Sequence, residues 1–167
     1  MKLELRKIRV GPTSRETNNF AADLYVDGKK CADVFNDGGG GNTRIYAYNG
    51  MNDLLRQAEA FAKTLPPVKN EFSSIDVPMN DLPMDLEFFC DMQVDDHLNK
   101  KYMERLQRKS ILVGKEGAKE FGQYKMRFAI SDMLRHSRHQ LTITLADIKS
   151  KLEPGEKILN TNLENLI

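Results

Sequence analysis

The sequence predicts an α+β fold, namely a mainly antiparallel sheet formed by an N-terminal β-meander, with two principal helices packed on it. Three observations predict it. Apolar and polar residues alternate over much of residues 1–50, a helical period follows over 52–65, and a second helical stripe runs over 84–109. We expect one domain, because 167 residues is the size of an ordinary single domain.

The meander of residues 1–50 reads as short strands separated by turn signals. Apolar residues alternate near the N-terminus, but their phase slips between Leu5 and Ile8, which predicts a β-bulge. Asp27 and Gly28 form a dipeptide favoured in tight hairpins, because both residues tolerate positive φ. The expected strands cover residues 3–10, 20–26, 31–35 and 43–48.

Two amphipathic stripes predict the helices. Over 52–65 the apolar residues recur with the helical period, Asn52 is the expected N-cap, and Pro66 and Pro67 stop the helix. The connector 66–83 holds four of the six prolines, so no regular element is expected there. A long helix, or two helices in series, is then expected over 84–109, with an apolar stripe from Leu86 to Leu106.

The C-terminal part, 110–167, has a mixed pattern. Strands are expected at 111–113 and 124–130, followed by a helical turn from Ser131. A helix is expected over 144–152, where Thr144 and Asp147 resemble a capping box. We expect these strands, with segment 157–163, to join the first sheet or to form a second small one.

Composition excludes few classes of protein. The net charge is +1, so bulk electrostatics favour neither nucleic acid nor a membrane as the partner. No apolar stretch approaches the ~18 residues of a membrane span, and the charged N-terminus does not read as a signal peptide. The two cysteines, Cys31 and Cys90, lack metal-ligand spacing, although one disulfide is possible. A cytoplasmic location is therefore expected.

The least ordinary feature is a glycine-rich loop between two expected strands. Its backbone N–H groups could cradle a phosphate or carboxylate, and the arginine that follows could add a bidentate contact. The loop lacks a P-loop lysine and the spacing of a dinucleotide fingerprint, and a flexible connection is the alternative. The candidate ligand-binding residues are Asn36, Asp37, Gly38, Gly39, Gly40, Gly41, Asn42 and Arg44.

Two charged stripes lie on the long helix. Glu87, Asp91 and Asp95 are spaced i, i+4 and i+8, so their carboxylates share one face and could hold a divalent ion for a metal-dependent hydrolase or nuclease. The alternative for both stripes is a solvated face that complements the helix dipole. The basic residues that could follow a nucleic-acid backbone are Lys101, Arg105, Arg108, Lys109, Lys115 and Lys119.

No Ser/His/Asp or Cys/His set stands out in the sequence. We therefore predict no catalytic residue, no metal ligand and no cofactor, and favour a non-catalytic binding protein over an enzyme. Its ligand would be a partner protein or a small anionic, nucleotide-like molecule, with nucleic acid as the alternative. No membrane contact is expected, and a homo-oligomer is possible if the glycine-rich loop becomes ordered in an interface.

Four segments carry a resemblance to a known group of proteins. They are Val26-Asp27-Gly28-Lys29, the loop from Asn36 to Gly41, the helical segment from Leu55 to Pro67, and the ending from Ile158 to Leu163. With them the chain resembles small uncharacterised proteins from phages and mobile elements of gut bacteria. The resemblance implies an accessory protein that acts by binding a host or phage protein, as an inhibitor of host defence, or by sequestering a nucleotide signal. It assigns no functional residue.

Overall fold

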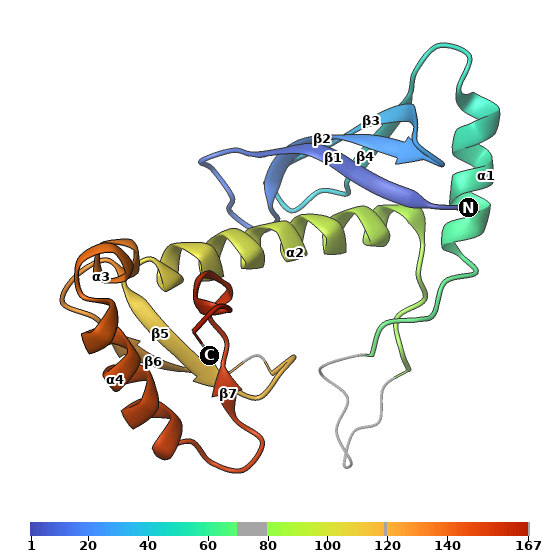
Figure 1. Cartoon of the computed structure of the whole chain (residues 1–167). Coiled ribbons are helices and arrows are strands. Elements are labelled where there is room, and N and C mark those ends of the chain that lie inside the picture. The colour runs from blue at the N-terminus through green and yellow to red at the C-terminus, as the bar shows by residue number, and fades with distance from the viewer. Residues whose placement is uncertain (70–79, 119, 167) are drawn as a thin grey trace. The chain divides into compact units, whose positions relative to one another are not determined.

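The computed structural model describes residues 1–69, 80–118 and 120–166 (Figure 1). Contacts divide the chain into two compact units, Met1–Leu98 and Asn99–Ile167, each with its own hydrophobic core. Helix α2 (Leu86–Gln107) runs through the boundary. The α+β class is confirmed, whereas folding as one domain stays a prediction. Among the described residues, no helix has both the length and the apolar character to cross a bilayer.

The first unit contains the expected meander. Its strands β1 (Leu3–Val10), β2 (Asn19–Val26), β3 (Lys29–Asp37) and β4 (Arg44–Ala47) pair antiparallel, each with the next along the chain. This order follows from short connections, which place consecutive strands side by side.

Local sequence signals determine the irregular points of this sheet. The β1–β2 register shifts between Arg6 and Arg9, and Lys7 takes a φ of 54°, so the bulge predicted from the phase slip is confirmed. Asp27 and Gly28 have φ values of 48° and 81°, which is the left-handed pair that a tight hairpin needs. A second register shift between Leu24 and Tyr25 turns both Cys31 and Ala32 toward the core.

Two helices cover the inward face of the first sheet. α1 (Asn52–Ala62) buries Leu55, Ala58 and Ala62, which belong to one core with the inward strand residues and the N-terminal half of α2. The predicted N-cap at Asn52 is wrong: the cap residue is Met51, and no side chain caps the helix. In the connector, Val68 and Leu82 form an isolated bridge, and residues 70–79 lie outside the described residues.

The second unit confirms a separate small sheet, with the order β6-β5-β7. Its core combines the apolar residues of the central strand with those of the two helices that follow. The elements are β5 (Ser110–Gly114), β6 (Gly122–Lys125), α3 (Ile130–His136), α4 (Arg138–Ser150), β7 (Lys157–Ile158) and a 3-10 turn (Thr161–Leu163).

Three boundaries in this unit differ from the prediction. The strand expected at 124–130 ends at Lys125, because Lys125 pairs with the first residue of β5 and finds no partner strand beyond it. Helix α4 begins at Arg138 rather than at residue 144, and the Thr144 hydroxyl donates to Gln140 O (2.9 Å) within the helix, so the capping box is wrong. The strand expected at 157–163 has only two residues.

Candidate functional site

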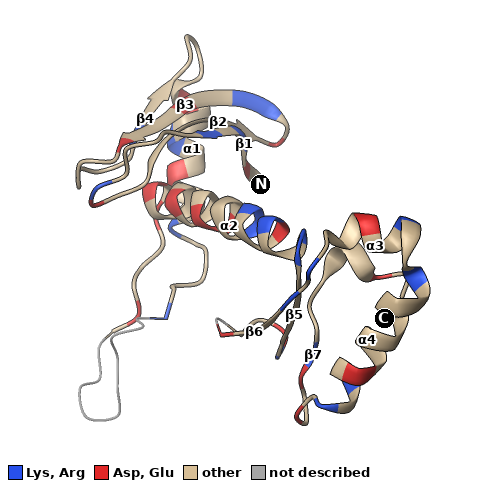
Figure 2. Ribbon diagram, turned by 90° about the vertical axis from the view of Figure 1, so that its left-hand side faces the viewer, with Lys and Arg blue, Asp and Glu red and all other residues tan. Residues whose placement is uncertain are grey.

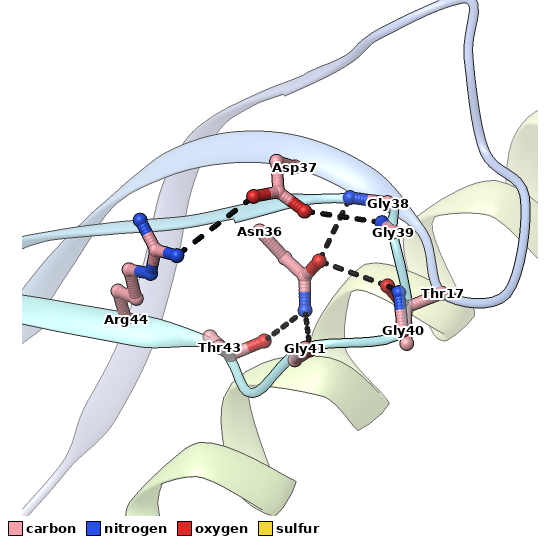
Figure 3. A network of polar contacts seen from close by, with 9 residues as sticks. All are labelled: Thr17, Asn36, Asp37, Gly38, Gly39, Gly40, Gly41, Thr43 and Arg44. Carbon is pink, nitrogen blue, oxygen red and sulfur yellow. Dashed lines mark hydrogen bonds and ion pairs between the residues drawn. The ribbon is translucent and has the colours of Figure 1, made fainter.

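Asn36 organises the glycine-rich loop (Figure 3). The residue is buried, and its Oδ1 accepts hydrogen bonds from Gly38 N and from the Thr17 hydroxyl, both at 2.9 Å. Its Nδ2 donates to Gly41 O (2.9 Å) and to Thr43 Oγ1 (3.2 Å). Both ends of the Asn36 amide therefore bind the chain itself, as a buried amide requires.

Three loop N–H groups that could hold an anion already have acceptors. Gly38 N donates to Asn36 Oδ1, Gly39 N donates to Asp37 Oδ1 at 3.0 Å, and Gly40 N donates more weakly to Thr17 Oγ1 at 3.3 Å. An anion in this loop would have to displace acceptors of the protein itself. The loop therefore presents its exposed rim to solvent rather than an open cradle of N–H groups.

Backbone conformation explains two of the four glycines. Gly38 and Gly40 have φ values of +82° and +88°, which side chains rarely adopt. A Cβ at Gly38 would also lie 2.6 Å from the carbonyl oxygen of Thr13, whereas a Cβ at Gly41 would meet nothing within 4 Å. At least half of the glycine run is thus required by the path of the chain.

Arg44 is the cationic member of the predicted ligand set, and its side chain is 57% exposed. Its guanidinium lies 3.9 Å from the Asp37 carboxylate and 5.8 Å from the centre of the Phe35 ring. Both contacts are at the long end of their range, so they leave donors free for a ligand.

The acidic stripe of α2 binds the loops of the first unit. Glu87 accepts from Thr43 N at 3.0 Å, Asp91 from the Thr43 hydroxyl at 2.5 Å, and Asp95 from Asn18 Nδ2 at 2.6 Å. Burial raises the pKa of Asp91; the bond from Thr43 opposes this, and the charges of Glu87 and Asp95 add to it. Within the described ranges, no group of three His, Cys, Asp or Glu side chains is placed to hold a metal ion.

Charge is divided unequally between the two units. Residues 1–98 hold 11 of the 25 basic residues and 16 of the 24 acidic ones, which leaves 14 basic and 8 acidic residues for 99–167. The first unit thus has a net charge of −5 and the second of +6. Figure 2 shows the change along α2, from acidic in its N-terminal half to basic in its C-terminal half. The near-zero net charge of the whole chain therefore combines an acidic first unit with a basic second unit.

The second sheet gathers basic residues at one of its ends. Arg108 and Lys109 precede β5, Lys125 pairs with Ser110, and Lys109 O accepts the N–H of Met126. These basic residues are exposed, and so are Arg127 and Phe128, which follow β6. The Arg127 guanidinium lies 5.3 Å from the centre of the Phe128 ring. Cations and one exposed aromatic ring therefore share this end, which we call the basic end.

The predicted basic set is only partly brought together. Arg108 and Lys109 lie at the basic end, and Lys101 and Arg105 are exposed on the last turns of α2. Lys115 follows the opposite end of β5, beside Glu116, about 20 Å from Lys109 at roughly 3.3 Å per residue. Lys119 lies outside the described residues.

Sequence reasoning missed Lys125, Arg127 and Phe128, which only the β5–β6 pairing brings to Arg108 and Lys109. The available signal was the run from Lys125 to Phe128, which interleaves basic and aromatic residues. Comparisons with family models, with curated proteins and with solved structures found no match to this chain.

Proposed function

We propose that the chain is a non-catalytic binding protein whose ligand is nucleic acid, held at the basic end of the second unit. One observation carries the proposal: Arg108, Lys109, Lys125 and Arg127 lie together at one end of a sheet in a unit of net charge +6. Within the described residues, no carboxylate forms an ion pair with any of the four. Their charges are available to phosphate groups.

The proposal predicts how strongly the affinity for nucleic acid depends on salt. Each phosphate neutralised on a single strand releases condensed counterions, and four contacts give a log–log salt slope of about −3. Phe128 is 57% exposed beside these cations, so an unpaired base can stack on it. A single strand is therefore the favoured form.

The test measures fluorescence anisotropy of a labelled single strand of about 15 nucleotides at roughly 50 and 200 mM salt. The double variant Lys109→Glu/Lys125→Glu should weaken binding by more than about tenfold. The control is Lys115→Glu/Lys149→Glu, which changes charge equally away from the basic end and should weaken binding by less than about threefold. Equal losses in both variants, or no binding by the wild type at low salt, would refute the proposal.

A second candidate function concerns the surface around the glycine-rich loop. We propose that a partner protein or a small anionic ligand contacts Arg44 and the exposed rim from Gly39 to Asn42. Support comes from the exposure of the Arg44 guanidinium, and such a contact suits the accessory or host-defence inhibitor role that the resemblance to uncharacterised phage proteins implies. A ligand of this surface should raise the melting temperature of the wild type and not that of Arg44→Ala.

A further inference from the structure

The outer face of the first sheet, opposite α1 and α2, is rich in aromatic and basic side chains. The inward strand residues pack with the two helices in one core, and the residues that alternate with them point outward. Tyr46 is 58% exposed, and the other rings are half-buried. The outward aromatic residues are Tyr25, Phe35, Tyr46 and Tyr48.

One cross-strand row forms a hollow on this face. The strand pairing places Arg9, Ala21, Phe35 and Arg44 in line across β1 to β4. Because Ala21 is small, a shallow hollow of about 500 Å³ lies between Arg9 and Phe35. The Phe35 ring lines the hollow and stacks on Tyr46 with centroids 5.6 Å apart, and the Asp37 carboxylate also belongs to the lining residues.

The charges around the hollow are unequally neutralised. The buried Asp23 carboxylate forms ion pairs with Lys30 at 3.1 Å and with Lys7 at 3.6 Å, so its charge is neutralised. Arg9 lies within ion-pair distance of no carboxylate among the described residues, and Arg44 has only its long contact with exposed Asp37. Arg9 therefore brings a guanidinium group with free donors to the hollow, and Arg44 brings another to within 5.8 Å of the centre of the Phe35 ring.

We propose that this hollow binds a nucleoside phosphate, with the base stacked on Phe35 and the phosphate held by Arg9, while Arg44 adds a second cation next to the Phe35 ring. An exposed ring accepts any base by its π-face, and guanidinium groups bind phosphate with paired hydrogen bonds. The inference rests on the second candidate function, for which it names the ligand class, and it adds Arg9 and Phe35 to the residues around the glycine-rich loop.

Charge favours a free nucleotide over a strand at this site. The carboxylates of Glu4, Asp33 and Asp37 interrupt the basic residues of the outer face, so no continuous path suits successive phosphates. The first unit is also acidic overall, at −5, which repels a polyanion. A single phosphate group near Arg9 needs no such path, and it meets less repulsion than a polyanion does.

Calorimetric titration of the full chain with adenosine monophosphate tests the inference, with adenosine and inorganic phosphate as separate titrants. Binding of the nucleotide should be at least about tenfold tighter than that of either part, because the ring and the guanidinium groups act together. Arg9→Gln and Phe35→Leu should each weaken it by about tenfold. Arg56→Gln, a change at an exposed arginine on α1, should leave it within about twofold.

Each other outcome overturns the inference in a distinguishable way. The proposed site is wrong if Arg9→Gln and Phe35→Leu leave the nucleotide affinity unchanged. It is also wrong if millimolar nucleotide gives no detectable heat of binding. If the nucleotide does not bind but a different ligand does, and Arg44→Ala abolishes the binding of that ligand, the inference fails while the second candidate function stands. A short single strand that binds far more tightly than the nucleotide, through Arg9 and Phe35, would replace the free nucleotide. The Lys109→Glu/Lys125→Glu variant should bind the nucleotide as the wild type does, which separates this result from the nucleic-acid proposal.

Discussion

The hydroxyl of Thr43 donates a 2.5 Å hydrogen bond to Asp91, and this contact fastens the end of the glycine-rich loop to helix α2. The neighbouring Thr43 N–H donates to Glu87 one helical turn earlier. The acidic stripe thus has a structural task in the first unit. Changes at Asp91 and in the glycine-rich loop should therefore alter the stability of the fold.

Asp91→Asn should raise the stability of the fold at neutral pH. Burial raises the pKa of Asp91, so between its unfolded value and this higher folded value the native state binds the proton more tightly. The contribution of Asp91 to the free energy of unfolding therefore falls as pH rises through that window. At pH 7 the charged carboxylate destabilises the fold. Asparagine removes the charge and still accepts from Thr43. Urea unfolding should show a gain at pH 7 that shrinks toward pH 4, whereas exposed Asp96→Asn should show little change at either pH.

Gly38→Ala should lower the stability of the fold, whereas Gly41→Ala should not. The first places a Cβ against Thr13 O at a positive φ and should cost about 2 kcal/mol or more. The second meets open space and should be neutral or stabilising by up to about 1 kcal/mol. Chemical unfolding of both variants measures the difference. Equal losses would show that the loop does not have this conformation.

Asn36→Asp should destabilise the chain, although it is nearly isosteric. The change replaces the donor to Gly41 O and Thr43 Oγ1 by a second acceptor, in a buried position. An unpaired buried acceptor of this kind costs about 2–3 kcal/mol. The same change at exposed Asn49 should cost less than about 0.5 kcal/mol in the same unfolding experiment. A loop built only for a ligand would instead keep its stability in Asn36→Asp and lose binding.

Both thiols should react slowly in the native chain. Cys31 and Cys90 are free and buried, and burial raises the pKa of each thiol, with the Asp91 charge adding to the effect at Cys90. A thiol reagent at pH 8 should label neither within the time that labels both in urea. Fast labelling of one cysteine without denaturant would mark a local opening of its part of the core.

The fold was predictable where local pattern and tertiary pairing agree. The phase slip predicted the bulge at Lys7, and Asp27-Gly28 predicted its hairpin, because these features depend on a few adjacent residues. The extent of β6 and the start of α4 were not predictable, because a partner strand and a preceding helix set them.

The same distinction applies to the candidate sites. Sequence singled out the loop from Asn36 to Asn42, but Thr17, which occupies the Gly40 N–H, lies on a different connection. The basic end combines residues before β5 with residues after β6, and only their register joins them. Both sites therefore depend on contacts between residues that are far apart in the sequence, which a pattern along the chain does not predict.

The bulge at Lys7 also interrupts an exposed edge of the first sheet. Strand β1 is an edge of its sheet, and an edge offers unpaired N–H and C=O groups to any passing strand. The left-handed turn at Lys7 breaks that row in the middle and brings Arg6, Lys7 and Arg9 to the break. The straight part of this edge is therefore short, and an interrupted edge with basic residues is one of the devices by which native sheets limit edge-to-edge pairing.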